Sequence, residues 1–347
     1  MRIEQIMNAN ALNQYYAGVK GTSFVESAMP STYNQNFDLK VLKGAKGSYA
    51  QVLQASNYDV EPMARDYATS TTFIDNKPLY RERMSINEQA RADFLTVLAT
   101  GDAETINAYA SNLFEQFAGK TGFLSSVRAL NTIQLGQFLC SGTIKVKENG
   151  VNKYLDYGLD SDLNVSLLGA TTWSKPTATP IKDLQYGLDL LLSKGKTVDV
   201  AIMNRYTYQL LANHETVKTL ITDQKILPSM DNVRTTIEQL TGLKIVIWDD
   251  VATVNGTTEK AMKDGFVTLV PNGSLGSCEY GPTPARTDKI HGVADGRTIV
   301  DLNGTYATLE VVNVVKGSSV TNIDIVIEAL VAINPTIIDS MYVLKVI

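Results

Sequence analysis

The chain has 347 residues, of which 44% are hydrophobic and 19% are charged, and its formal net charge is −5. This length allows one large domain or two to three smaller ones, and the hydrophobic fraction is sufficient for a sizeable core. A protein that binds nucleic acid tightly usually carries a basic patch or a high pI. The acidic balance therefore argues against strong or sequence-specific DNA binding, and the densest basic pair, Arg81 and Arg83, has Glu82 between its members.

The two cysteines, Cys140 and Cys278, lie far apart and form no CxxC pattern. This usage gives no sign of a disulfide framework and favours a reducing cytoplasm. The first residues lack the charged-then-apolar layout of a signal peptide. No run of about 18 apolar residues predicts a transmembrane helix.

Residues 1–47 are rich in Asn, Gln, Ser, Thr, Tyr and Gly and show no sustained apolar periodicity. We expect them to form an extended N-terminal arm that becomes ordered on partner molecules. Residues 48–85 are predicted to be an extended loop, a hairpin with strand-like stretches at 49–54 and 70–74. Because an isolated two-stranded ribbon is marginal in water, we expect this loop to lie on another subunit.

Helical periodicity marks the start of the next segment, 86–180. One helix is predicted over 86–99, and a longer helical pattern runs over 102–140 with Asp102 as its N-cap. Gly119 and Gly122 are the positions at which this helix would bend or break. If unbroken, it would be about 50 Å long.

A hairpin is predicted after this helix, which Gly142 ends. Asn149 and Gly150 separate the alternating stretches 143–147 and 151–158, and Asn-Gly is the strongest short-range signal for a tight hairpin turn.

Helices and strands alternate over residues 181–270, which predicts a compact α/β module with its own core. Asn204 is the predicted N-cap of its second helix. The predicted elements are a helix at 181–194, a strand at 198–203, helices at 205–213, 214–222 and 231–241, and strands at 244–248 and 265–270. Residues 271–347 return as strands, predicted at 298–302, 306–316, 323–333 and 342–347.

The sequence contains few patterns typical of catalytic or metal-binding sites. His214 and His291 form no HExxH or HxH motif, and the chain contains no GxSxG, GxxxxGK[ST] or GxGxxG motif. Cys140 lies at an apolar helix end and is interpreted as a core residue rather than a nucleophile. We therefore assign no catalytic, cofactor-binding or metal-binding residue and favour a structural protein over an enzyme.

The best candidate for an acidic metal site is the pair Asp249 and Asp250, which follows a predicted strand. Carboxylates at a strand end can bind magnesium. Adjacent side chains in extended backbone point in opposite directions, so a solvated turn is the favoured interpretation and a magnesium enzyme is the alternative.

Several strings, in their order and spacing, resemble the major capsid protein E family of tailed phages, typified by the lambda head protein. They are Arg128-Ala129-Leu130 through Phe138 to Ile144, Val151 through Leu155-Asp156-Tyr157-Gly158, Thr171-Thr172-Trp173-Ser174 followed by Pro176 and Pro180, Ala201-Ile202-Met203-Asn204 with Leu210-Leu211-Ala212-Asn213, and Val270-Pro271 with Tyr280-Gly281-Pro282. The resemblance begins at about residue 78, and the preceding residues match in character only.

This resemblance implies an α+β fold of the Hong Kong 97 type. Its parts would be an N-terminal arm (1–47), an extended loop (48–85), a peripheral domain with a long spine helix (86–180), an axial α/β domain (181–270) and returning strands shared between the two domains (271–347). Some such shells crosslink Lys to Asn. No motif near Lys40, Lys43 or Lys46 supports such a crosslink here.

The implied function is that of a major capsid protein, which forms hexamers and pentamers of an icosahedral shell around double-stranded DNA. The implied partners are further copies of the chain, a scaffold protein, a portal and a decoration protein, without membrane contact or sequence-specific DNA binding. The implied location is the virion, with assembly in the cytoplasm of a host bacterium. An encapsulin-like compartment or another phage structural protein, such as a tail tube, is an alternative.

Overall fold

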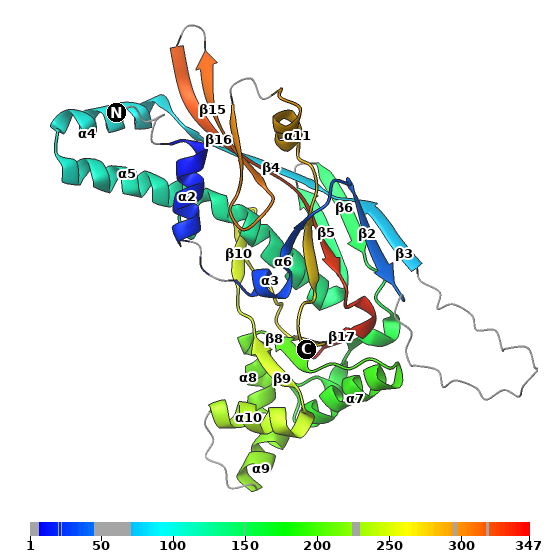
Figure 1. Ribbon diagram of the computed structural model, residues 1–347. Coiled ribbons are helices and arrows are strands. Elements are labelled where there is room, and N and C mark those ends of the chain that lie inside the picture. The colour runs from blue at the N-terminus through cyan, green and yellow to red at the C-terminus, as the bar shows by residue number, and fades with distance from the viewer. Residues whose placement is uncertain are drawn as a thin grey trace, which may run out of the picture. The chain divides into compact units, whose positions relative to one another are not determined.

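The computed structural model describes residues 7–19, 21, 23–44, 71–148, 150–223, 230–293, 297–316 and 319–347. The chain divides into two compact units (Figure 1). Unit 1 takes its residues from Met1–Leu39, Asn76–Thr132 and Ser277–Asn334. Unit 2 takes its residues from Lys40–Asp75, Ile133–Gly276 and Pro335–Ile347.

Unit 1 is built on a mixed sheet whose longest strand is β16. The strand order is β1 (Ser31–Tyr33), β13 (Gly276–Tyr280), β16 (Ser319–Pro335), β15 (Thr308–Lys316) and β14 (Thr298–Asp301), and β4 (Leu79–Ile86) also pairs with β16. Figure 1 shows β15 and β16 as a long antiparallel pair. Ile323, Ile325 and Ile327 occupy every second position of β16, so they share one face of the strand, and all three are buried.

The helices of unit 1 are α2 (Ala9–Val19), α3 (Phe24–Ala28), α4 (Glu88–Thr100), α5 (Ala103–Ala118), the first residues of α6 (Ser126–Ser141) and α11 (Pro284–Ile290), with the short 3-10 helix η1 (Phe123–Ser125). The sequence analysis did not predict α2, α3 or α11. Leu12 and Tyr16 of α2 and Val25 of α3 are buried in this unit. The expectation that residues 1–47 are extended is therefore wrong at 9–19 and 24–28, because spaced apolar residues within a polar segment suffice to pack a short helix. Residues 1–6, 20, 22 and 45–47 lie outside the described residues.

The long helical pattern is broken in the structure at the two glycines named as candidates. The helix α5 ends at Ala118, η1 follows Gly122, and α6 begins at Ser126. A Cβ atom at Gly122 would lie 2.9 Å from the carbonyl oxygens of Glu115 and Gln116, which is closer than real side chains approach. The chain turns here because glycine alone fits, so the unbroken helix does not form.

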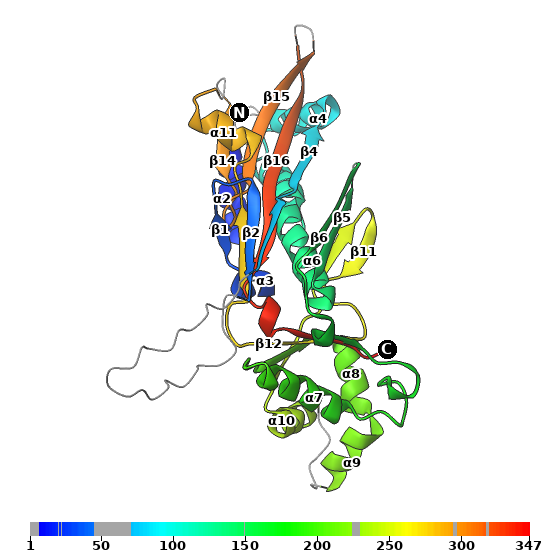
Figure 2. The same ribbon diagram turned by 90° about the vertical axis from the view of Figure 1, so that its right-hand side faces the viewer.

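Unit 2 contains an α/β core. Its five-stranded sheet has the order β7 (Asn164–Ser166), β17 (Tyr342–Lys345), β12 (Phe266–Val270), β8 (Val200–Met203) and β9 (Lys244–Ile247). β8 and β9 are parallel, and α8 (Arg205–Asn213), α9 (Glu215–Asp223) and α10 (Met230–Thr241) lie between them in the chain. In Figure 2, α7 (Pro180–Ser193), α8 and α10 lie on one side of β12. Trp173, Leu191, Leu211 and Leu269 belong to the core that they enclose.

The alternating elements predicted over 181–270 are thus confirmed, with boundaries that shift by a few residues. The sheet also takes β7 and β17 from outside that range. The remaining elements of unit 2 are β10 (Val251–Val254) paired with β11 (Thr257–Lys260), β5 (Thr143–Glu148) paired with β6 (Val151–Asp156), and the 3-10 helices η2 (Ser161–Leu163), η3 (Gly169–Thr171) and η4 (Ile338–Ser340). Asn149 of the predicted hairpin turn lies outside the described residues.

The strand predicted at 70–74 in the extended loop is present, and it pairs with a strand that the sequence analysis did not predict. β3 (Thr71–Asn76) pairs with β2 (Asp38–Lys43), and the predicted strand at 49–54 lies outside the described residues. The ring centroids of Phe73 and Tyr157 are 5.6 Å apart, and Lys153 Nζ lies 2.8 Å from a carboxylate oxygen of Asp75. The inner face of this ribbon therefore lies on the chain's own β5–β6 hairpin rather than on another subunit alone.

Gly136 of α6 permits a close approach of two elements in unit 2. A Cβ atom at this position would overlap the backbone carbonyl of Ala261, which follows β11. Overpacking of this kind usually costs about 1–3 kcal/mol. The helix and the β10–β11 hairpin can thus touch only through glycine.

We expect the substitution Gly136→Ala to lower the thermal stability of the unassembled chain, because the added methyl group pushes Ala261 away from the helix. Gly18→Ala is the matched control, since it also lies in a helix and its Cβ would meet nothing within 4 Å; alanine there should be neutral or stabilise by about 0.5–1 kcal/mol. Melting followed by far-UV circular dichroism checks both. Equal midpoints for the two variants would contradict this account of Gly136.

Candidate functional site

Asp249 and Asp250, the acidic pair predicted from the sequence, follow β9 and point to different partners. A carboxylate oxygen of Asp249 accepts a hydrogen bond from the backbone N–H of Arg205 at 2.8 Å, and its other oxygen lies 3.2 Å from Nε of Arg205. Asp250 accepts a hydrogen bond from the indole N–H of Trp248 at 2.8 Å. The two carboxylates therefore do not converge on a common ligand position, as their adjacency in extended backbone predicted.

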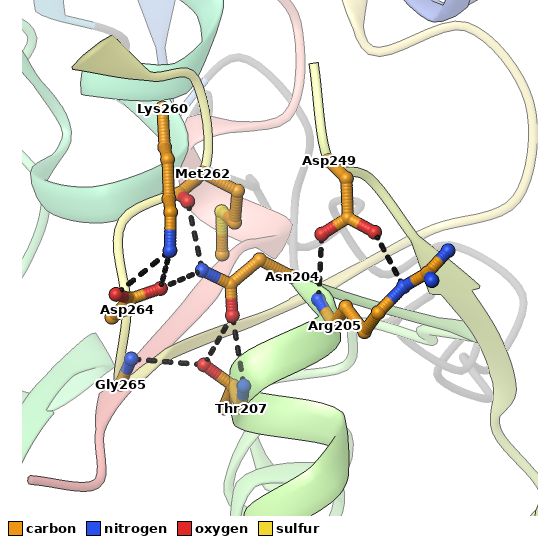
Figure 3. Close-up of polar contacts among 8 residues, drawn as sticks. All are labelled: Asn204, Arg205, Thr207, Asp249, Lys260, Met262, Asp264 and Gly265. Carbon is orange, nitrogen blue, oxygen red and sulfur yellow. Dashed lines mark hydrogen bonds and ion pairs between the residues drawn. The ribbon is translucent and has the colours of Figure 1, made fainter. Parts of the chain in front are cut away.

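Asn204 is the centre of the polar network beside this pair (Figure 3). Its side-chain oxygen accepts hydrogen bonds from the backbone N–H of Thr207 at 2.9 Å and from the Thr207 hydroxyl at 2.7 Å. Its amide nitrogen donates to the carbonyl of Met262 at 3.1 Å and to the carboxylate of Asp264. The predicted N-cap of α8 is confirmed, and the same side chain also binds the loop before β12.

The loop before β12 is held from its other side as well. The backbone N–H of Gly265 donates to the Thr207 hydroxyl at 2.8 Å, and Lys260 Nζ lies 2.8 Å from a carboxylate oxygen of Asp264. Asn204 is 1% exposed, and both donors and the acceptor of its amide are used. Buried polar groups stabilise a fold only when they are fully hydrogen-bonded. The hydrogen bonds of Asn204 and Thr207 therefore connect the end of β8, the start of α8 and the loop before β12.

Metal-ligand geometry is not found near this network. Across the residues that the structure describes, no three or more His, Cys, Asp or Glu side chains are grouped so that they could hold a metal ion. His214 is buried, with Nε2 positioned 2.9 Å from the carbonyl of Lys175 and Nδ1 2.8 Å from the Thr216 hydroxyl. His291 is the exposed C-cap of α11. Both histidines thus occupy helix ends, as the C-caps of α8 and α11.

Both cysteines are buried and free. Burial raises the pKa of the Cys140 thiol to about 11 and that of Cys278 to about 12. Sγ of Cys140 lies 3.7 Å from the sulfur of Met262. Because the thiolate is the nucleophile, this position confirms that Cys140 is a core residue.

The basic pair Arg81 and Arg83 on β4 contacts buried acids on the neighbouring strand β16. Arg81 forms an ion pair with Glu328, and Arg83 lies 3.2 Å from a carboxylate oxygen of Asp324. The register places Arg81 opposite Glu328. These arginines are therefore used in the sheet of unit 1.

Sequence reasoning missed a buried ion pair in unit 1. Nζ of Lys77 lies 2.9 Å from Oε1 of Glu279, and the side chain of Lys77 is 0% exposed. Asn34 and Asn334 donate to the two carboxylate oxygens of Glu279 at 2.9 and 2.7 Å. In the sequence, Lys77 is marked only by its position directly before Pro78. That position does not indicate that Lys77 is buried or that Glu279 is its partner.

The sequence comparison finds one family model that matches part of the chain. Residues 126–294 match the family described as phage major capsid protein E. The resemblance stated from the sequence is confirmed over this range, which contains α6, the β5–β6 hairpin and most of the α/β core. No curated protein matches the chain in sequence.

Two solved structures share the fold across nearly the whole chain. A phage-related protein from Bordetella bronchiseptica RB50 has 11% sequence identity and a TM-score of 0.56, with 97% of each chain covered. A prophage protein from E. coli CFT073, described as a proposed capsid protein, has 12% identity and a TM-score of 0.58, with 98% of this chain and 99% of that chain covered. The predicted α+β fold of the Hong Kong 97 capsid type is confirmed.

A membrane-spanning helix was not expected from the sequence. Within the described ranges, no helix has both the length and the apolar character needed to span a membrane.

We expect the substitution Asn204→Ala to destabilise unit 2 by about 2 kcal/mol or more, because it removes an N-cap and leaves buried donors and acceptors unpaired. Asn213→Ala is the matched control, since Asn213 is an exposed amide on the same helix, and exposed substitutions usually change stability by less than about 0.5 kcal/mol. Both tryptophans lie in unit 2, so their fluorescence during urea unfolding reports this difference. The role of Asn204 would be refuted by equal urea midpoints.

We also expect both thiols of the native chain to resist a maleimide reagent at pH 8, because burial excludes the reagent and their raised pKa values keep them protonated. The denatured chain should react at both cysteines, which serves as the control. Mass spectrometry counts the adducts. Rapid labelling of either native thiol would contradict the burial described above.

Proposed function

We propose that this protein is the major capsid protein of a tailed bacteriophage. Copies of the chain assemble into hexamers and pentamers of an icosahedral shell that encloses double-stranded DNA. The single observation that carries the proposal is the match of residues 126–294 to the phage major capsid protein E family. The shared fold of two phage-related proteins over 97% or more of this chain supports it.

The five segments expected from the sequence remain our proposal for how the chain is used in the shell. Residues 1–47 act as the arm, 48–85 as the extended loop, 86–180 as the peripheral domain, 181–270 as the axial domain, and 271–347 as strands shared between the last two. The helices packed in unit 1 restrict the part of the arm that can reach a neighbour. We propose that the residues of the arm that contact a neighbouring subunit are 1–8 and 34–47.

The outer face of the β2–β3 ribbon supports a role in contacts between copies. Leu42 is 61% exposed and Ile74 is 58% exposed, while Phe73 and Asp75 face the β5–β6 hairpin. The side chains of a strand alternate between its faces. One face of the ribbon is therefore used within the chain, and the other presents apolar side chains for a neighbouring subunit.

The protein acts as a structural component of the virion rather than as an enzyme. The carboxylates of Asp249 and Asp250, which carried the enzyme alternative, are hydrogen-bonded to Arg205 and Trp248. A scaffold protein, a portal and a decoration protein are the further partners, and assembly takes place in the host cytoplasm. Enclosed DNA is held without sequence-specific contacts, in keeping with the net charge of −5.

Electron microscopy of the purified chain, alone and with candidate scaffold proteins, tests the proposal. We expect hexamer rings from the unaltered chain alone and closed particles when a suitable scaffold protein is present. The double variant Leu42→Asp with Ile74→Asp should remain folded and fail to close particles, because charge on the ribbon's outer face opposes burial against a neighbour.

The conservative double variant Leu42→Met with Ile74→Val is the control and should assemble as the unaltered chain does. Closed particles from the aspartate variant would show that assembly does not require the outer face of the ribbon. A small oligomer from the unaltered chain under every condition would overturn the capsid function itself. Closed empty shells formed without any scaffold protein would favour the encapsulin-like alternative.

A further inference from the structure

Among the residues that the structure describes, β9 forms one edge of the five-stranded sheet of unit 2, with β8 as its neighbour. The backbone N–H groups of Lys244 and Trp248 donate to carbonyl groups of the β8 segment at 2.7 and 2.9 Å. Successive residues of a strand direct their backbone N–H and C=O groups to alternate sides. Those of Ile245 therefore point away from β8, toward the open edge of the sheet.

An open strand edge of this composition is a template for other chains. Unpaired backbone groups at an edge can pair with a strand of a second molecule. Residues 245–248 of this chain read Ile-Val-Ile-Trp, an apolar run with three β-branched residues and no proline, which is the composition that favours such pairing. The opposite edge strand, β7, has only three residues, and short edges pair poorly. The edge that needs protection is therefore β9.

Two side chains of α10 occupy the open edge of β9. Oε1 of Glu238 accepts a hydrogen bond from the backbone N–H of Ile245 at 2.9 Å, and Nη2 of Arg234 donates to the Ile245 carbonyl at 2.7 Å. Nε of Arg234 lies 3.1 Å from the same Oε1, and Figure 1 shows α10 next to β9. The two side chains thus place an acceptor opposite the N–H and a donor opposite the C=O, as a residue of a neighbouring strand would.

The placement of this pair in α10 is not explained by the stability of the helix. An ion pair at i, i+4 supports a helix best when the acid comes first, because the helix dipole favours acids near the N-terminus. In α10 the order is reversed, since Arg234 precedes Glu238. The side chains are 39% and 29% exposed, and exposed ion pairs contribute little to stability. The pair therefore serves the strand edge rather than the helix.

We propose that Arg234 and Glu238 form an edge guard, which prevents a strand of a second copy of the chain from adding to β9. This inference goes beyond the proposed function, because it concerns an association that the proposed shell does not use. It holds whether or not the chain closes shells, so the guard and the assembly of shells are tested separately.

The double variant Arg234→Ala with Glu238→Ala removes the guard and leaves the net charge unchanged. We expect it to remain folded by circular dichroism. In sedimentation velocity it should form species larger than those of the unaltered full-length chain, in proportions that rise with chain concentration. Hydrogen exchange locates the new contact. The backbone amides at 243–249 should exchange at least about tenfold more slowly once these species form, because strand addition buries the edge.

Two further variants separate the guard from a general effect of charge. Lys182→Ala with Asp189→Ala also removes one basic and one acidic side chain, from exposed positions of α7 in the same unit. Glu238→Gln keeps Arg234 and an amide oxygen that can accept from the N–H of Ile245. Both variants should sediment as the unaltered chain does.

Each of the other outcomes decides against the proposal. A folded double variant that sediments as the unaltered chain does would show that the edge needs no guard. Larger species from either control variant, or protection outside 243–249, would show that another surface or charge alone is responsible. If the double variant does not fold, Glu238→Ala alone takes its place under the same criteria. If that variant also unfolds, the pair is a structural part of unit 2 and the guard is wrong.

Discussion

The buried ion pair of Lys77 and Glu279 is the constraint on which the organisation of unit 1 depends. Two charges removed from water each lose several kcal/mol of hydration, and only a complete set of hydrogen bonds offsets this loss. Here Lys77 also donates to the carbonyl of Asn36 at 2.7 Å, and both oxygens of Glu279 accept side-chain amides from Asn34 and Asn334. Four distant stretches of chain must therefore meet in one arrangement: the link after β1, the residue that follows β3, the strand β13 and the end of β16. A shift of Lys77 or Glu279 would leave a buried charge unpaired, and a shift of either other stretch would remove hydrogen bonds from the pair.

Elements whose signals are local could be predicted from the sequence. The caps at Asn204 and Asp102, the break at Gly119 and Gly122, and the alternation of strands and helices over 181–270 depend on residues within a few positions of one another, and the structure confirms them. The ion pair could not be predicted, because Lys77 and Glu279 are far apart in the chain and no local pattern marks a lysine that will be buried. For the same reason the pairing of β3 with β2 was not predicted, and the predicted strand at 49–54 lies outside the described residues.

The N-terminal segment shows how composition can mislead. Its polar residues predicted an extended arm, yet Leu12, Tyr16 and Val25 bury their side chains in unit 1. Few apolar residues are needed when the surface that receives them is already formed. Met29 then precedes β1, whose parallel register with β13 places Ser31 opposite Cys278. Removing α2, α3 and β1 would expose the core that they cover, so these three elements belong to the folded body of the chain.

The proposed contact surface of the ribbon differs from these constrained regions in a physically consistent way. Around Asn204 and Glu279 the polar atoms are buried and paired within the chain, so those regions have no free hydrogen-bonding groups to offer a partner. The outer face of the β2–β3 ribbon instead exposes the apolar side chains of Leu42 and Ile74. Apolar surface of this kind is stabilised only when a partner covers it. We therefore infer that contacts between copies of the chain use the ribbon rather than the polar networks.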